Sequence, residues 1–241
     1  MPPNPFAWRS ELATADAKPA RLEFWFDFAS TYSYVAAMRI EGLCRDAGVD
    51  LMWKPFLLGP IFAQQGSSDS PFNLHPHRGA YMWRDLDRLC AKFDLPWRRP
   101  SHFPRASTLA ARVACEIADK PWAVDYIRGV FAANFGEDRE IGERAVIVEI
   151  LTGLGHDAGE VLALAESPER RGMLRANTER AFAIGVFGAP NCYVGDELFW
   201  GEEALEDAVA WALGVRPVGR TGSPKENRRQ APGNTGEAAG G

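Results

Sequence analysis

The feature that most constrains this chain is a strand, a helix and a second strand packed into residues 21–53. In 21–28 every second residue is Leu or Phe, which places these apolar side chains on one face of a strand. A helix is predicted to begin after Ser30 and to end at Gly48, and a strand over 49–53 follows at once. Three elements this close together form a βαβ unit, whose strands are normally parallel with a right-handed crossover.

Helical patterns dominate the next stretch, from about residue 61 to residue 184. Prolines separate the helices expected there, which cover 79–94, 104–118, 121–134, 142–153, 157–165 and 167–184. Strand signals return only at 192–194 and 198–200, joined by a Gly-Asp turn, and an amphipathic helix is expected over 202–213. The order βαβ, helical block, ββα predicts an α/β thioredoxin-like fold with a large all-helical insertion.

The two ends of the chain differ in composition from its middle. Residues 1–20 are rich in Pro, Ala and polar groups and predict a loose arm, and 215–241 contain almost no apolar side chains. Such a segment buries too little surface to offset its chain entropy, so a disordered tail is predicted. The thioredoxin-like domain is then expected to comprise 21–60 and 185–214, with the helical insertion domain at 61–184.

Composition narrows the classes of function. The formal net charge is −5 and no basic stripe is present, so nucleic acid is not expected as a partner. No apolar run approaches the ~18 residues of a membrane span, and the first residues lack the apolar core of a signal peptide, so a soluble cytoplasmic protein is expected. No two cysteines have CxxC spacing, which disfavours a zinc ribbon or a dithiol. The cysteines expected to be reduced core residues are Cys44, Cys90, Cys115 and Cys192.

The strongest candidate for chemistry is the segment DFASTYSY at 27–34, where the first strand meets the helix. A side chain here lies among unpaired backbone N–H groups at the positive end of the helix dipole, which stabilises a nearby negative charge. A cysteine in this position becomes a thiolate, whereas Ser30 has too high a pKa to ionise and could instead donate a hydrogen bond to a bound anion. Ser30 could equally be an ordinary N-cap, and Ser33 is expected to give local support.

A second candidate is GVFGAP at 185–190, directly before the third strand. A proline at the start of a strand fits an edge position or a cis bond. A cis Ala189–Pro190 bond would expose the N–H and C=O of Ala189, so that an extended peptide ligand could pair with them as an added strand. A plain tight turn is the alternative.

Weaker candidates lie elsewhere in the chain. Glu203, in the first turn of the last helix, either complements the helix dipole or meets a ligand ammonium. Arg78 either holds a carboxylate or lies in solvent. His75 and His77 alternate, but no third ligand has suitable spacing, so no metal site is predicted. Four aromatic side chains are expected near the site, where they suit a flat apolar substrate, although most of them could instead belong to the core: Trp25, Tyr32, Phe187 and Trp200.

These pieces, in this order, resemble the 2-hydroxychromene-2-carboxylate isomerases and the related kappa-class glutathione transferases. The resemblance spans about residues 21–214. It rests on FDFASTYSY at 26–34, SPFNLHPHRGAYMWRDLDRLC at 70–90, GVFGAP at 185–190, and ELFWG at 197–201 followed by LEDA at 205–208. Several separate motifs in register are more specific than any one of them alone.

The resemblance implies a homodimer that binds glutathione and a small aromatic substrate. Ser30 would hydrogen-bond to the glutathione sulfur and favour its thiolate, and Ala189, beside a cis Pro190, would pair with the cysteinyl backbone. It also implies a cis–trans isomerase, in which the thiolate adds to a conjugated double bond and leaves after rotation about the resulting single bond.

The chain departs from the family pattern at several positions. Glu203, Arg78 and Ser68 stand where an aspartate, a lysine and an asparagine are expected to contact glutathione. Thr31 replaces the usual proline after the serine, and Ala204 replaces an arginine. Losing one hydrogen bond to a charged ligand group costs ~1.5–3 kcal/mol, so several such losses could weaken glutathione binding.

Three other functions therefore stay open. One is a kappa-like glutathione transferase, and a second is a divergent thioredoxin-fold binding protein that has lost glutathione. The third is a thiol–disulfide oxidoreductase that uses Cys192, which is disfavoured because this cysteine enters a strand and not a helix N-terminus.

Overall fold

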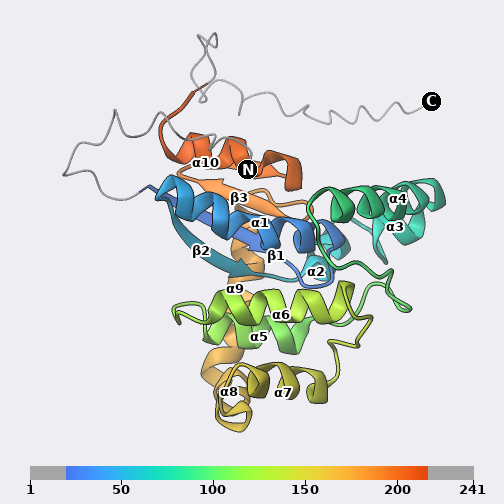
Figure 1. Cartoon of the computed structure of the whole chain (residues 1–241), viewed down its shortest axis with the longest axis vertical. Helices are drawn as coiled ribbons and strands as arrows, with labels where there is room; N and C mark the ends of the chain where they lie inside the picture. Colours follow the sequence, from blue (N-terminus) through green and yellow to red (C-terminus); the bar gives the residue numbers. More distant parts are fainter. Residues whose placement is uncertain (1–19, 217–241) are drawn as a thin grey trace, which may run out of the picture.

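The computed structural model describes residues 20–216, and its centre is a four-stranded sheet in the order β2-β1-β3-β4 (Figure 1). β1 (Arg21–Phe26) pairs in parallel with β2 (Asp50–Pro55). β3 (Asn191–Val194) is antiparallel to both β1 and β4 (Glu197–Trp200). The predicted thioredoxin-like α/β fold is confirmed, with slightly different strand bounds.

The crossover between β1 and β2 is helix α1 (Thr31–Ala47). Ser30 is its N-cap, because the Ser30 hydroxyl oxygen accepts a hydrogen bond from the Ser33 N–H at 3.2 Å. The helix ends at Gly48, whose φ of 59° lies in the left-handed region that glycine adopts without steric cost. Both predicted ends of this helix are therefore confirmed, and Ser30 lies at the junction between strand and helix.

Between β2 and β3, every element in the described chain is a helix. These helices are α2 (Leu58–Gln64), α3 (Pro71–Leu74), α4 (Pro76–Lys92), α5 (Thr108–Glu116), α6 (Ala123–Phe135), α7 (Arg144–Gly153), α8 (Ala158–Ala165) and α9 (Pro168–Ala183). The two shortest, α2 and α3, were not predicted, because Gly59 and Pro60 in α2 and the polar stretch before α3 are typical of loops.

Several predicted helices start a few residues from the predicted position, and two of these differences have a visible structural form. The helix expected from residue 104 begins only at Thr108, because the preceding Arg105 side chain is buried and held by Asn134 and Asp138. The last helix opens with a 3₁₀ turn, η2 (Glu202–Ala204), before α10 (Leu205–Ala212). Most of the predicted arm and tail lie outside the described residues.

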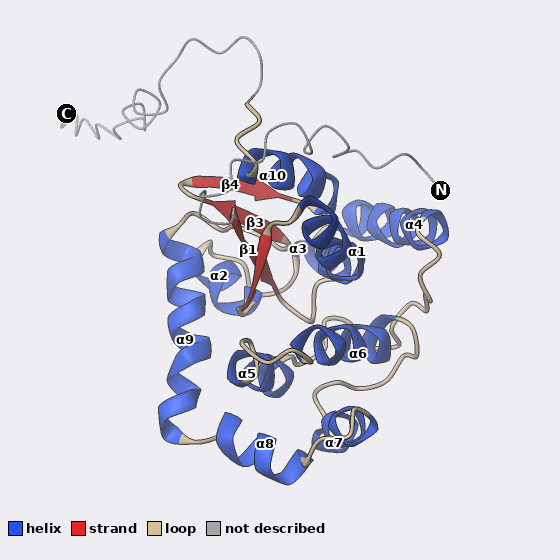
Figure 2. Ribbon diagram, turned by 60° about the vertical axis from the view of Figure 1, so that its left-hand side comes forward, coloured by secondary structure: helices blue, strands red, loops and turns tan. Residues whose placement is uncertain are grey.

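The sheet carries helices on both faces. Helices α1 and α10 pack together on one face, where Phe24, Phe26 and Phe28 are fully buried. This core continues into the helical block, since the rings of Phe28 and Phe131 on α6 lie 4.9 Å apart. Trp25 belongs to a smaller cluster on the other face with residues of α2 and α9. Figures 1 and 2 show α5–α8 stacked beneath the sheet and α9 returning alongside it to β3.

The cysteines expected in the core are all buried and unpaired. Burial raises the pKa of each thiol, which keeps it protonated and weakly nucleophilic. Cys192 is only 1 % exposed, so its thiol has no access to a substrate disulfide. Within residues 20–216, no helix is both long and apolar enough to cross a membrane.

Candidate functional site

A cavity of about 1580 Å³ opens where α1 begins. Its wall comes from loops and helix ends that are far apart in the sequence, within 27–32, 57–65, 67–72, 77–89, 103–108, 187–189 and 200–203. The thioredoxin-like part supplies the β1–α1 junction, the segment after β2, the loop before β3 and the turn after β4, and the helical block supplies the rest. Most of the exposed surface of the wall is apolar, and hydroxyls, carboxylates and cations are interspersed in it, which is typical of a small-molecule site.

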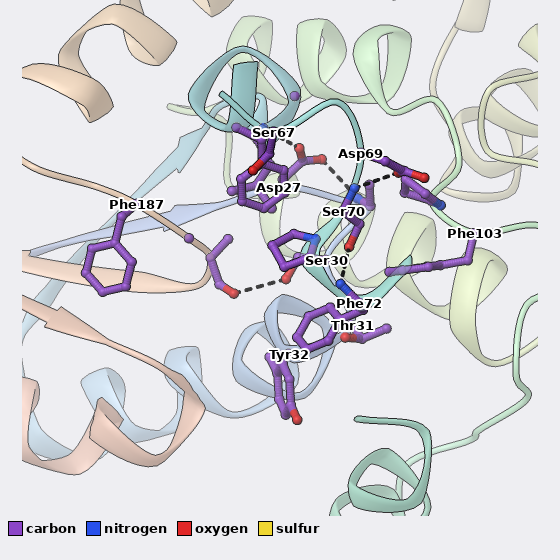
Figure 3. A pocket seen from close by; sticks show the side chains of 18 of the residues that line it. Asp27, Ser30, Thr31, Tyr32, Ser67, Asp69, Ser70, Phe72, Phe103 and Phe187 are labelled. Atoms are coloured by element: carbon purple, nitrogen blue, oxygen red, sulfur yellow. Dashed lines mark hydrogen bonds between the residues drawn. The ribbon is translucent and has the colours of Figure 1, made fainter. Parts of the chain in front are cut away.

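Ser30 lies in the inner wall of this cavity and is 8 % exposed. Its hydroxyl donates a hydrogen bond to the carbonyl oxygen of Ala189 at 3.1 Å, a contact that joins the two motifs singled out in the sequence. Figure 3 shows this hydroxyl pointing across the cavity, with Phe187 on one side of Ser30 and Phe103 on the other. Ser30 is thus an N-cap, as the simpler hypothesis held, and also a donor that faces the cavity.

The Ala189–Pro190 peptide bond is cis, as one of the two hypotheses for GVFGAP predicted. The loop is fixed on both sides: the Asn191 side chain donates to the Gly188 carbonyl at 2.7 Å, and the Gly201 N–H donates to the Pro190 carbonyl at 3.0 Å. Within residues 20–216 the Ala189 N–H has no hydrogen-bond acceptor. Ala189 therefore offers backbone groups to an extended ligand, whereas Pro190 is buried behind it and is not part of the cavity wall.

Asp27, which the sequence argument passed over, lies in the same wall and is 3 % exposed. Its carboxylate accepts hydrogen bonds from the Ala29 N–H, the Leu58 N–H and the Ser107 hydroxyl, at 2.9, 2.8 and 2.7 Å. Burial raises the pKa of this carboxyl above its ordinary value, against the lowering effect of the three donors. The signal available in the sequence was a charged residue directly after the aromatic run at 24–26.

Neighbouring residues of α1 have supporting roles. The Thr31 hydroxyl, at the position where the resembled families have proline, lies 3.2 Å from the Met82 sulfur and ties α1 to α4. Ser33 is fully buried and absent from the cavity wall. Its contribution is the backbone N–H that Ser30 caps, which agrees with the predicted local support.

The remaining sequence candidates lie on the outer rim of the cavity. Ser68, Arg78 and Glu203 all line it and all are exposed. Glu202 is different, because it is buried and its carboxylate accepts from Arg39 at 2.6 Å. Of the adjacent glutamates, the more exposed Glu203 is therefore the one free to contact a ligand.

Aromatic side chains form two pairs in the cavity wall. The rings of Phe187 and Trp200 lie 5.0 Å apart, and those of Tyr32 and Phe72 lie 6.1 Å apart. The Tyr32 hydroxyl donates to Asp85 at 3.1 Å, and burial together with this carboxylate raises the Tyr32 pKa, so the phenol stays neutral. Trp25 was wrongly expected here: it is fully buried on the far face of the sheet.

A metal centre finds no support in the described part of the chain, where no group of three or more His, Cys, Asp or Glu side chains could hold an ion. His77 lies in the cavity wall beside Arg78. The site thus consists of a hydroxyl donor, an exposed backbone edge, rim charges and aromatic walls. Such a set can hold a peptide-like anion next to an apolar molecule.

Comparison with known proteins identifies the fold family. Residues 21–210 match the model of the DSBA-like thioredoxin domain. The chain belongs to this family. Among curated relatives, a 2-hydroxychromene-2-carboxylate isomerase of Sphingobium xenophagum is 25 % identical over 192 residues, covering 80 % of this chain and 97 % of that protein. A glutathione S-transferase kappa 2 of Caenorhabditis elegans is 27 % identical over 186 residues, covering 73 % and 81 %.

A solved structure shares the fold of this DsbA-like chain. The structure of a 2-hydroxychromene-2-carboxylate isomerase superposes with a TM-score of 0.72 at 24 % identity, over 80 % of this chain and 94 % of that one. At this identity the likeness shows a shared fold. Relatives within the family thus carry the names of isomerases and of glutathione transferases.

Proposed function

We propose that this chain is a glutathione-dependent enzyme, and specifically a cis–trans isomerase of an aromatic or unsaturated carboxylate. One observation carries the proposal: the Ser30 hydroxyl, at the N-terminus of α1, faces the backbone of Ala189 beside a cis proline inside one cavity. A hydrogen-bond donor at that place suits a sulfur anion, and the adjacent backbone edge suits a short peptide.

Ser30 would act on the thiol of the peptide. Its hydroxyl has one proton to donate, which in the structure goes to the Ala189 carbonyl. A bound thiolate would take over this hydrogen bond, and the Ala189 carbonyl would then be free to accept from the ligand backbone. The hydrogen bond and the positive end of the α1 dipole both favour the charged sulfur, so we expect the thiol pKa of bound glutathione to fall.

The rim charges match the ends of glutathione. Arg78 offers a planar, permanently charged donor for a carboxylate, and Glu203 offers a carboxylate for an ammonium group. Ser68 lies on the same rim with a hydroxyl that can donate or accept. These are the assignments that the sequence predicted for them, and they remain proposals.

The rest of the cavity would hold the substrate. Bound glutathione would supply a thiolate nucleophile that adds reversibly to a conjugated double bond and so allows rotation about it. The aromatic pairs Phe187–Trp200 and Tyr32–Phe72 offer flat apolar surfaces on which such a substrate can stack. Tyr32 keeps its proton and donates it to Asp85, so its ring presents a neutral surface to the substrate.

A kappa-like transferase is the second candidate, supported by the relative of that name that is 27 % identical to this chain over 186 residues. It would use the same thiolate but keep the bond that forms to the acceptor. We also infer that the chain acts in the cytoplasm, in keeping with the buried, unpaired cysteines. A homodimer is proposed from the resemblance alone.

Calorimetric titration with reduced glutathione tests the proposal. We expect a Kd of about millimolar or tighter, and weaker binding of S-methylglutathione, which lacks the thiol that Ser30 would meet. Activity toward an unsaturated aromatic carboxylate with no consumption of glutathione would then favour the isomerase over the transferase. No heat and no thermal shift at high millimolar glutathione would contradict the proposal and favour a binding protein that has lost this ligand.

A further inference from the structure

The starts of three helices meet at the side chain of Asp27. One carboxylate oxygen accepts from the Ala29 N–H, in the turn before α1, and from the hydroxyl of Ser107, the residue before α5. The other oxygen accepts from the Leu58 N–H, the first amide of α2. Asp27 therefore connects the three segments that form the floor and sides of the cavity.

Neither α2 nor α5 has an N-cap side chain of its own. The residue before α2 is Leu57, which has no polar side chain, and the Ser107 hydroxyl before α5 donates to Asp27 instead of capping its own helix. The first amide of α2 thus finds its acceptor in a residue distant in the sequence. Positive ends of several helix dipoles near one carboxylate also favour its charged form.

Burial makes this arrangement costly. Asp27 is 3 % exposed, all three of its side-chain partners are donors, and loss of water raises the pKa of its carboxyl. Two of the three partners are backbone N–H groups that can only donate, and only the Ser107 hydroxyl could accept from a protonated Asp27, so the contacts fit the carboxylate best. A buried charge kept against its desolvation cost is typical of a site whose geometry serves function.

The turn from β1 to α1 is held by further contacts. The Ser30 N–H donates to the Asp27 carbonyl at 3.0 Å, so the same residue fixes Ser30 through its main chain. The fully buried Asn134 side chain donates to the Phe28 carbonyl at 2.8 Å from the opposite side. Between Asp27 and Ser30, every residue is therefore held by at least one named hydrogen bond.

We propose that Asp27 is a positioning residue that sets the Ser30 hydroxyl at the right place for a bound thiolate, an inference that rests on the proposed glutathione site. Asp27 acts through Ala29 on the serine, and through Leu58 and Ser107 it joins that serine to the helical wall of the cavity. Ligand affinity is expected to depend mainly on Ala189 and the rim, whereas the thiol pKa depends on where Asp27 holds Ser30.

The variant Asp27→Asn tests the inference, because it keeps the size of the side chain but leaves an NH₂ group facing one of the donors. We expect amide exchange at Ala29 or Leu58 to quicken at least ~5-fold, measured by nuclear magnetic resonance. We expect the pKa of the bound glutathione thiol, read from thiolate absorbance, to rise by ~0.5–1 unit, while Kd changes less than ~3-fold. Ser107→Ala removes one of the three contacts and should give a smaller change of the same sign.

Asp157→Ala is the control, since Asp157 caps the distant helix α8 and its loss lowers stability without touching the cavity. If neither Asp27→Asn nor Ser107→Ala changes amide exchange or the bound thiol pKa beyond this control, the positioning role is wrong. Equal changes of amide exchange and of the bound thiol pKa in all three variants would mean that Asp27 only stabilises the fold, which would also contradict the inference. If amide exchange quickens but the parent protein binds no glutathione, the proposed function fails, while the hydrogen bonds by which Asp27 holds the three segments are confirmed.

Discussion

The inner wall and the outer rim of the cavity are built in opposite ways. In the inner wall, Asp27, Ser30 and the Ala189 carbonyl are shielded and joined by hydrogen bonds to parts of the chain far away in sequence. On the rim, Ser68 and Arg78 are exposed at a loop and at the first turn of α4. We infer that the fold fixes the groups proposed to act on the thiol, whereas the rim residues proposed to contact the ends of glutathione can be replaced more easily.

The departures from the resembled families lie mainly on the rim. The serine of those families is present in the inner wall as Ser30, whereas the proposed ligand contacts that differ from the pattern, Ser68, Arg78 and Glu203, all lie on the rim. Thr31 is the exception, because it replaces the family's proline inside the wall and is 1 % exposed. A rim residue can be exchanged for one of the same charge because solvent adapts around it, but a buried donor has no such freedom.

The largest expected effect is a difference in cysteine reactivity between the start of α1 and the core. Ser30→Cys places a thiol at the N-terminus of a long helix, where its pKa should fall, while Cys44, Cys90 and Cys192 have thiol pKa values raised by burial. We expect it to react with a disulfide reagent at least ~100-fold faster than any cysteine of the parent protein. Ser33→Cys is the matched control, since Ser33 is fully buried, and equal rates in the two variants would contradict this account.

A smaller effect concerns the rim. Arg78→Ala should weaken glutathione binding by about tenfold or more, the loss of one hydrogen bond to a charged group, without changing the pKa of the bound thiol. Arg84→Ala, on the same helix but paired with Asp87 and outside the cavity wall, should leave the affinity unchanged. Calorimetry measures both, and a shift of the thiol pKa in Arg78→Ala would break the proposed division between wall and rim.

The smallest effect is a pH dependence of stability. Because the pKa of Asp27 is raised in the folded state, the folded chain keeps a proton there that the unfolded chain has already released. The free energy of unfolding of the parent, relative to Asp27→Asn, should therefore decrease as the pH rises from the ordinary aspartate range through the raised pKa. Denaturant unfolding at several acidic pH values measures this difference in free energy of unfolding. A difference that stays constant or increases with pH would show that folding does not raise the pKa of Asp27.

Much of the inner wall could be predicted from the sequence. The alternation of Phe residues in β1, the glycine that stops α1 and the proline before β3 are local signals, and they placed Ser30 and Ala189 at their junctions. The contact between Ser30 and Ala189 could not be predicted from local signals. It follows from the antiparallel pairing of β3 with β1, which brings the loop after β1 and the loop before β3 to the same end of the sheet.

The parts that could not be predicted depend on contacts distant in sequence. Helix α2 has Gly59 and Pro60 in its first turn and takes its cap from Asp27, so its own residues give no start signal. Trp25 alternates with the core phenylalanines as β-strand geometry requires, but only the packing of α2 and α9 shows that it is covered and not lining the cavity.

The central claim is that Ser30 stabilises a thiolate in the cavity, and the pKa of the bound glutathione thiol tests it most directly. Thiolate absorbance of the complex, titrated with pH, should give a thiol pKa clearly below that of free glutathione in the parent protein. In Ser30→Ala the pKa should return toward the free value, with only a modest loss of affinity. An unchanged low pKa in Ser30→Ala, or a pKa in the parent equal to that of free glutathione, would contradict the account.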